Sequence, residues 1–320
     1  MGKLSVFVPH ATPWSGQALP FAAFTRQSGA HRLWQGQSMT CDPHQTFAYV
    51  AGRGYRLPVG IGVSLMPFRH PLGAALEASH LATTMEHPVV AGYGSGWAAL
   101  QHMLLGRAYG SQIGAAREYL VIMKSLLDEG KADCAGEYFT CHAELPSLSR
   151  PPVEVGLGVL RPGAARLAGE VADVAVAWLA PAAYLRDVIL PSMAAGAAAA
   201  RRPVPRLVAI VPFALSGPGR DASDMALASS AAHMLLPHYV DMLRRSGIAV
   251  DMRDPQASGA ALAAGDAFLF GDVGDIVSKL SHYWRAGVDE IVLNPTGVFL
   301  KEGLRSALNE LETIVSATPA

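Results

Sequence analysis

The sequence predicts a single (β/α)8 (TIM) barrel that spans residues 1–320. Two observations carry this prediction. Apolar runs of strand length, bounded by glycine and proline, alternate with segments of helical periodicity, and such runs suit parallel strands buried on both faces. The first run ends in Pro9-His10 rather than in a glycine-rich phosphate loop. This disfavours the main rival, an open doubly wound sheet.

Eight apolar runs are predicted to be the strands of this barrel. Eight strands that are each followed by a helix close into a parallel barrel. In chain order they cover residues 4–9, 32–38, 58–65, 88–94, 153–157, 171–178, 207–213 and 290–294.

Helical patterns separate these strands. A helix is expected to begin at His70-Pro71 and to run to about Glu86. Two further helices present apolar residues at three- and four-residue spacing; Gly130 ends the first, and Asp272 caps the second before Gly287. Their apolar positions are Tyr119, Leu120, Met123, Leu126 and Leu127 in the first and Ile276, Val277, Leu280, Tyr283 and Trp284 in the second.

The interval between the seventh and eighth strands, residues 216–270, is longer than one helix requires. We expect an insertion there, with a helix from about Asp221 and an extra segment that contains a loop over residues 251–265. Residues 96–109 are a second candidate insertion. No internal repeat or linker interrupts the chain.

Composition excludes several classes of protein. Hydrophobic residues make up 51% of the chain and charged residues 16%, so a large core is expected and disorder is not. The net charge is −1 and no basic stripe is present, which argues against a nucleic-acid partner. The apolar run 194–200 stops at Arg201-Arg202, and the first residues do not resemble a signal peptide. We therefore expect a cytoplasmic protein with no membrane partner.

Metal and disulfide chemistry are not expected. The three cysteines, Cys41, Cys134 and Cys141, contain no CxxC pair. Cys141-His142 could be half of a metal site, but no second ligand pair lies at metal spacing. The prediction is that no metal is bound.

In a barrel of this class the site is built at the carboxyl ends of the strands. Two glycine clusters lie there, at residues 92–96 and 156–158, and the second precedes Pro162-Gly163, where a helix should start. Glycines admit a flat ring or a phosphate, and a helix N-terminus attracts an anion; the alternative is that they only form tight turns. The candidates at the strand ends are His10, Gln37, Ser38, Gly62, Val63, Ser64, Gly94, Ser95, Gly96, Trp97, Gly156, Gly158, Trp178, Phe213 and Asn294.

No side-chain constellation for hydrolysis is present. Ser95 lies in GYGSG, which lacks the spacing of a nucleophile elbow, and no carboxylate pair sits at strand ends. A bound redox cofactor that brings its own chemistry fits this strand-end composition better.

Five segments in the same order resemble the luciferase-like monooxygenase superfamily, in particular its branch of deazaflavin (coenzyme F420)-dependent reductases. The segments cover nearly the whole chain. They are residues 29–38, 59–71, 89–96 and 152–178, together with the pair 270–272 and 286–290.

The resemblance implies a bulge with a non-prolyl cis peptide at Gly62-Val63, which backs the ring of the cofactor. It also implies a phosphate site near the glycines of the fifth strand and the helix after it. The implied cofactor contacts are Gly62, Val63, Ser64, Gly94, Ser95, Gly96, Gly156, Gly158 and Gly163.

Two departures from the family pattern affect the expected chemistry. Deazaflavin reductases often carry Asp-His where this chain has Gln37-Ser38, and some members carry a glutamate where it has Trp97. The expected catalytic residues are Ser38, which would bond near the reactive edge of the ring, and His10, which would supply a proton or is only structural. Trp97, Trp178 and Phe213 are the expected substrate-binding residues.

The resemblance implies an F420H2-dependent reductase, or the matching dehydrogenase. Its substrate would be a small molecule or a modified peptide with an activated C=C or C=N bond. Two alternatives stay open: an FMN-dependent monooxygenase and a non-catalytic flavin-binding homologue. A homodimer is one assembly that the sequence allows.

Overall fold

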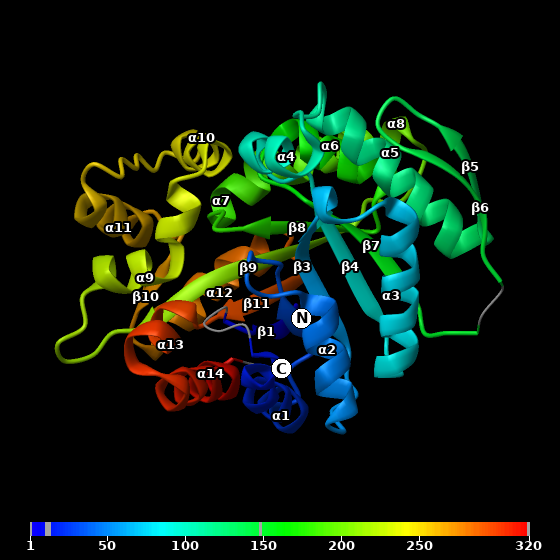
Figure 1. The fold of residues 1–320 in the computed structure, drawn as a ribbon. Coiled ribbons are helices and arrows are strands. Elements are labelled where there is room, and N and C mark those ends of the chain that lie inside the picture. Colours follow the sequence, from blue (N-terminus) through cyan, green and yellow to red (C-terminus); the bar gives the residue numbers. More distant parts are fainter. Residues whose placement is uncertain (1, 10–13, 147–148, 319–320) are drawn as a thin grey trace.

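Within residues 2–9, 14–146 and 149–318, which the computed structural model describes, eight parallel strands close into a barrel (Figure 1). The strands follow one another around the barrel in chain order, and the last pairs with the first. The predicted fold class is therefore confirmed. The barrel strands are β1 (Lys3–Phe7), β2 (Leu33–Gln35), β3 (Val59–Leu65), β4 (Val89–Gly94), β7 (Val153–Gly158), β8 (Val174–Trp178), β9 (Arg206–Leu215) and β11 (Glu290–Asn294).

Helices cover the outside of the barrel, and the predicted helix boundaries are confirmed. His70 Nδ1 accepts a hydrogen bond from Leu72 N and caps α3. Asp272 and Asp275 form a capping box at the start of α12, and Gly287 follows that helix with φ 92°. The helices outside the insertion are η1 (Ser15–Ala18), α1 (Leu19–Ser28), α2 (Pro43–Gly52), η2 (Met66–Phe68), α3 (Pro71–Met85), α4 (Ala98–Leu105), α5 (Gln112–Lys124), η3 (Ser125–Glu129), α6 (Pro162–Val171), α7 (Ala182–Tyr184), η4 (Leu185–Ile189), α8 (Leu190–Ala199), α12 (Val273–Arg285), α13 (Thr296–Glu302) and α14 (Leu304–Ala317).

The predicted insertion lies between β9 and β11, on one side of the barrel (Figure 1). It contains α9 (Ala222–Met234), α10 (Pro237–Arg245), α11 (Pro255–Ala264) and the short strand β10 (Leu269–Gly271). The expected loop over residues 251–265 is wrong, because most of it is α11. This helix is rich in alanine and has little amphipathic pattern, but Asp254 caps it and it packs closely on α9: a Cβ atom at Gly259 would lie 2.5 Å from Ser223 Oγ.

The sequence did not predict the antiparallel hairpin β5 (Lys131–Ala135) and β6 (Thr140–Glu144), which lies on the opposite side of the barrel from the insertion (Figure 1). Cys134 and Cys141 are directly opposite each other in it. The strand boundaries differ from the prediction most at β2 and β8. β2 ends at Gln35, so residues 36–38 belong to the following loop, and β8 begins at Val174, because residues 171–173 belong to the end of α6 and the turn after it.

The barrel interior is filled by a separate apolar cluster, with Val63 and Trp178 packed against it from the carboxyl ends of their strands. A filled interior leaves only the strand ends and their loops as a place for chemistry. The buried members are Phe7, Trp34, Val90, Val174, Val176, Val208, Ile210 and Val292.

A buried ionic network occupies the amino end of the barrel. Glu290 is fully buried and accepts hydrogen bonds from Ser5 Oγ at 2.7 Å and Trp34 Nε1 at 2.6 Å. Its carboxylate also pairs with Arg32 at 3.6 Å and Arg206 at 3.4 Å. Polar groups at this end of a barrel contribute to stability, so the candidate site is at the other end.

In the described part of the chain, none of the helices combines the length and the apolar character that crossing a membrane would need.

Candidate active site at the barrel mouth

The third strand carries an irregularity at its carboxyl end. The Gly62–Val63 peptide bond is cis, and the register of β3 against β4 shifts between Ile61 and Ser64. The bulge that the family resemblance implied is therefore confirmed at the expected position.

Glycines make room for this bulge. A Cβ atom at Gly36 would lie 2.7 Å from the Gly62 carbonyl oxygen, and one at Gly92 would lie 2.4 Å from the Ile61 carbonyl oxygen. A Cβ atom at Gly62 itself would lie 2.7 Å from Ile210 Cδ1. Since real Cβ atoms do not come this close to backbone atoms, Gly36 and Gly92 require glycine, whereas a side chain at Gly62 would only force the end of the Ile210 side chain to move.

Gln37 holds the bulge from the neighbouring strand end. Its backbone N–H donates to Val63 O at 2.9 Å, and its Oε1 accepts from Leu65 N at 3.0 Å and Ser64 Oγ at 3.2 Å. Ser64 is fully buried as a result. The loop position after β2, where the family resemblance led us to look for a catalytic residue, is thus partly a structural clamp.

Val63, Gly94 and Gly158 together form a surface on which the Val63 methyl groups are the only side-chain atoms of the three residues. A Cβ atom at Gly94 would lie 3.1 Å from Val63 Cγ2, and one at Gly158 would lie 3.4 Å from Val63 Cγ1. Side chains at the two glycines would therefore cover the valine methyl groups. We call Val63, Gly94 and Gly158 the platform. A flat apolar surface of this kind fits one face of an isoalloxazine-type ring.

The start of α6 lies directly beyond the platform. Arg161 is the N-cap residue and makes no side-chain hydrogen bond to the first turn, so the N–H groups of that turn remain available to an anion. A Cβ atom at Gly163 would have only Ile113 near it, at 3.8 Å, which leaves this side open. Tyr184 Oη donates to Leu160 O at 2.9 Å and fixes the loop.

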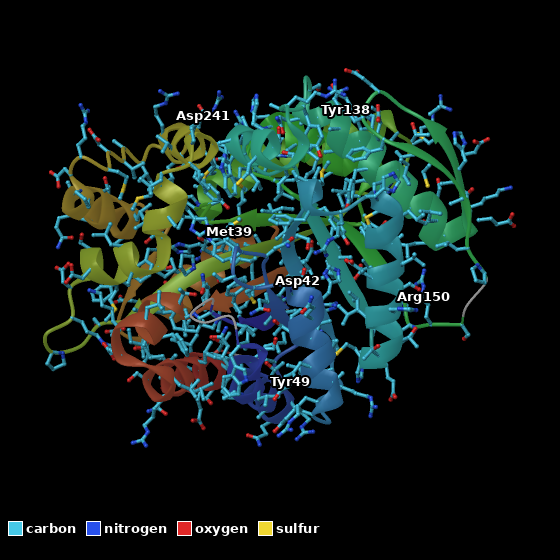
Figure 2. The ribbon with its side chains drawn as sticks, in the orientation of Figure 1. Met39, Asp42, Tyr49, Tyr138, Arg150 and Asp241 are labelled. Carbon is cyan, nitrogen blue, oxygen red and sulfur yellow. The ribbon has the colours of Figure 1, made fainter. Side chains whose placement is uncertain are left out.

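Arg161 was missed by the sequence reasoning, although its place just before Pro162 could have indicated it. Arg161 Nη1 lies 3.8 Å from a carboxylate oxygen of Asp241, which is on α10 at the edge of the molecule (Figure 2). Gly156, by contrast, is a member of the predicted cofactor set that is not exposed at the mouth. It is buried inside β7, where its Cβ atom would lie 3.1 Å from Gly92 Cα, so it serves close strand packing.

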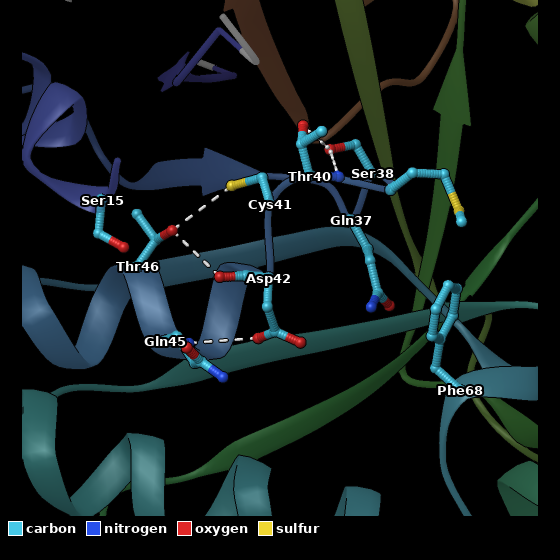
Figure 3. Close-up of a pocket in the computed structure, with 10 residues that line it drawn as sticks. Ser15, Gln37, Ser38, Thr40, Cys41, Asp42, Gln45, Thr46 and Phe68 are labelled. Carbon is cyan, nitrogen blue, oxygen red and sulfur yellow. Dashed lines mark hydrogen bonds between the residues drawn. The ribbon is translucent and has the colours of Figure 1, made fainter. Parts of the chain in front are cut away.

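A cavity of about 280 Å³ lies beside the β2–α2 loop (Figure 3). Ser38 borders it, and its Oγ accepts a hydrogen bond from Thr40 N at 3.2 Å and lies 3.2 Å from Thr40 Oγ1. The exposed side chains of Met39 and Phe68 add apolar surface to this mostly polar lining. The lining residues are Ser15, Gln37, Ser38, Met39, Thr40, Cys41, Asp42, Gln45, Thr46 and Phe68.

Asp42 remains ionised in this cavity. Burial opposes its ionisation, but hydrogen bonds from His44 and Arg69 and the charge of Arg69 outweigh burial and hold the pKa of the carboxyl well below its usual range. Arg69 Nη2 lies 2.6 Å from the carboxylate. Burial raises the pKa of the Cys41 thiol. Asp42 is therefore a poor proton donor near neutral pH, and the Ser38 and Thr40 hydroxyls are better placed to donate.

The far wall of the mouth is aromatic. Trp178 contacts the edge of Phe7 at 4.9 Å between ring centroids and stacks on His233 of α9 at 5.0 Å. His233 in turn contacts Tyr239 of α10 at 4.9 Å. The insertion helices thus complete this wall, and Trp178 lies where the sequence analysis expected it.

The remaining predicted residues are placed as follows. Phe213 is wrongly predicted to line the mouth: it is fully buried in the outer core, three residues from inward-facing Ile210 and so on the other face of β9. Ser95 O and Gly96 O accept from Gln101 Nε2 and shape the turn into α4. Trp97 is half-buried at the N-cap of α4, and His10 lies outside the described residues.

Among the described residues, no three histidine, cysteine or acidic side chains converge as a metal site would require.

Comparison with known proteins matches residues 10–290 to a family described as luciferase-like monooxygenase. No curated protein sequence matches the chain significantly.

Several solved structures share the fold. A coenzyme F420-dependent tetrahydromethanopterin reductase from Methanopyrus kandleri is 16% identical, with a TM-score of 0.76 over 99% of this chain and 98% of that one. An F420-dependent secondary alcohol dehydrogenase in complex with an F420–acetone adduct is 15% identical, with a TM-score of 0.79 over 100% and 99%. The oxygenating constituent of 3,6-diketocamphane monooxygenase from Pseudomonas putida, in complex with FMN, is 16% identical, with a TM-score of 0.72 over 99% and 98%.

Proposed function

Because this chain belongs to the luciferase-like monooxygenase family, we propose that it is an oxidoreductase that binds reduced coenzyme F420 at the barrel mouth and reduces an organic acceptor. The choice of deazaflavin over flavin rests on the sequence motifs that resemble the F420-dependent branch. When bound, the cofactor would supply a hydride from C5 of its ring. The acceptor would be a small molecule or a modified peptide with an activated C=C or C=N bond.

One observation carries the proposal. The platform carries no side chain other than the Val63 methyl groups and stands directly beside a helix N-terminus that lacks a side-chain cap. A ring that carries a phosphate-bearing chain needs both features, side by side and in this order along β7 and α6.

The residues at the barrel mouth would have the following roles. Val63, held by Gln37, would back one face of the ring, with Gly94 beside it. Gly158 and Gly163, with the charge of Arg161, would bind the phosphate. Trp97 and Trp178 would border the acceptor on the open face.

Proton supply is the remaining requirement of the reaction. Ser38 would form a hydrogen bond near the reactive edge of the ring, and His10 would supply the proton. The absence of the family histidine at Ser38 and of the glutamate at Trp97 supports one alternative, a non-catalytic flavin-binding homologue.

The direct test is a titration of the purified protein with F420H2 and with reduced FMN, followed by a screen of acceptors under anaerobic and aerobic conditions. We expect tight binding of F420H2 and anaerobic oxidation of it by an acceptor. Tight FMN binding with oxygen-dependent turnover would replace this proposal with the monooxygenase. Binding without any turnover would indicate a non-catalytic flavin-binding homologue.

Replacing Arg161 by glutamine is expected to weaken F420 binding about tenfold, since one charge-assisted contact to the phosphate is lost from a half-exposed position. The affinity for the phosphate-free chromophore FO should not change. Fluorescence titration measures both. Arg186→Gln is the control, because Arg186 is also exposed and pairs with its neighbour Asp187. An equal loss for both cofactor forms would contradict a phosphate contact.

Replacing Ser38 by alanine is expected to lower kcat roughly tenfold, the effect of one neutral hydrogen bond that strengthens during the reaction. The cofactor Kd should stay within about twofold, because the platform is not touched. Thr46→Ala, on the same cavity but away from Thr40, is the matched control. A change in Kd alone would assign Ser38 to cofactor binding instead of the chemical step.

A further inference from the structure

Two hydrogen-bond donors are buried near the barrel mouth without an acceptor among the described residues. They are Asn294 Nδ2, on a side chain that is fully buried, and Trp178 Nε1. A buried donor that stays unpaired costs about 1–3 kcal/mol, and native proteins pair nearly all such groups. Both donors lie at the carboxyl ends of barrel strands, where ligands bind.

The orientation of the Asn294 amide is fixed by its neighbour. Asn294 Oδ1 accepts from Thr296 N at 3.1 Å and from Thr296 Oγ1 at 2.5 Å. A backbone N–H can only donate, so the amide atom that faces it is oxygen, and a flipped amide is excluded. Nδ2 therefore points away from the turn that begins α13.

Both side chains belong to inward-facing positions. On β11, Glu290 bonds to Trp34 and Val292 lies in the interior cluster, so Asn294 is on the same face. On β8, Trp178 packs against the same cluster.

Phe7 lies next to both residues that carry the donors. The pairing of Val6 with Leu293 places Phe7 beside Asn294, and the Phe7 ring contacts Trp178 at 4.9 Å. In the closed strand order, β11 stands across the barrel from β4, which carries Gly94. Asn294 thus faces Gly94 across the mouth, whereas Trp178 is on β8, next to β7, which carries Gly158.

We propose that Asn294 Nδ2 and Trp178 Nε1 bind a carbonyl oxygen of a ligand that enters the mouth. Both donors are uncharged N–H groups, which suit a carbonyl oxygen better than a cation. The oxygen can come from the pyrimidinedione ring of the cofactor or from the acceptor substrate. This inference rests on the proposed function for the position of its ligand, but the donor pair itself does not depend on which cofactor binds.

The first test uses the chain loaded with F420. Asn294→Leu removes the donor and keeps the branched shape of the side chain, whereas Thr296→Val disturbs the same turn and keeps Nδ2. If the cofactor ring supplies the oxygen, Asn294→Leu raises the F420 Kd by about tenfold. If the substrate supplies it, the substrate KM rises and the F420 Kd does not. Thr296→Val should leave the F420 Kd and the substrate KM within about twofold of the parent values. Thermal unfolding checks that each variant is folded.

The second test needs no turnover. The chain has five tryptophans, so their indole N–H signals can be resolved by ¹⁵N NMR. The signal that disappears in Trp178→Phe is the signal of Trp178. FO and 2-cyclohexen-1-one are added in separate experiments. The probe whose carbonyl oxygen accepts from Trp178 Nε1 should move this signal downfield. A shift in a protein that binds no cofactor would support the donor pair while refuting the proposed function. No shift with either probe, together with unchanged Kd and KM in Asn294→Leu, would overturn the inference.

Discussion

Replacing Val63 by aspartate is expected to abolish cofactor binding while the barrel stays folded. The Val63 methyl groups fill the space between Gly94 and Gly158 and are the apolar part of the platform. A carboxylate pressed against the face of a ring would lose its water without gaining a partner, which costs several kcal/mol. A cost of about 4 kcal/mol lowers the affinity about a thousandfold.

Fluorescence titration with F420 measures this loss, and circular dichroism with thermal unfolding shows whether the variant is folded. Two control variants show whether the loss of binding requires both the new charge and its position at residue 63. Val63→Ile keeps an apolar platform and should bind, and Val121→Asp introduces the same charge at an exposed position of α5. Binding of F420 to Val63→Asp with the parent affinity would show that the platform does not support the ring.

The same geometry predicts that hydride is transferred on one face of the ring only. The platform would cover one face of a bound ring, so the acceptor would approach from the opposite face. Transfer from a deuterium-labelled cofactor, followed by NMR of the recovered cofactor, tests this. Loss of label from both faces would contradict the assignment of the platform.

Replacing Glu290 by alanine is expected to lower the free energy of unfolding by about 3–5 kcal/mol, the cost of leaving a buried charge without its partner. Arg32 is itself almost fully buried, and burial lowers its pKa although Glu290 and Glu154 oppose this. Without Glu290, the Arg32 guanidinium would keep its hydrogen bonds to Val59 O and Pro88 O, but its nearest remaining carboxylate would be that of Glu154, at 3.9 Å. Ser5 and Trp34 would also lose their acceptor.

Chemical denaturation measures the change. Glu312→Ala, at an exposed position of α14, is the control and should be nearly neutral. The double variant Glu290→Leu with Arg32→Met should recover part of the loss, because it removes both buried charges of the pair. A loss below about 1 kcal/mol in Glu290→Ala would mean that the network at the amino end adds little to stability.

The sequence determined those features whose signals lie in neighbouring residues. Each barrel strand is a contiguous apolar run between glycine and proline, so all eight were found, with errors only at their ends. The start of α3 at His70 and the capping box at Asp272 are likewise local, because the groups that form them are within three residues of each other. The bulge at Gly62–Val63 was found through the family resemblance, which itself depends on a contiguous segment.

The tertiary structure decided which faces and which partners these elements have. Phe213 is an aromatic residue near the carboxyl end of a barrel strand, as a substrate contact would be. The alternation of side chains along β9 nevertheless places it in the outer core. Gly156 looks equivalent to Gly158, and only the approach of Gly92 shows that it packs strands together. The hairpin of β5 and β6 and helix α11 carry weak periodicity, and their packing against the rest of the fold selects their structure.

The same limit applies to the candidate site. Gln37 bonds to residues 26 to 28 positions away, Arg161 lies near Asp241 on the insertion, and Asn294 and Trp178 become a pair only because the barrel closes. Periodicity and capping report local preferences, whereas contacts between distant segments depend on strand register and barrel closure. The chain alone therefore indicated the barrel and the end at which its site lies, and the fold decided which side chains meet there.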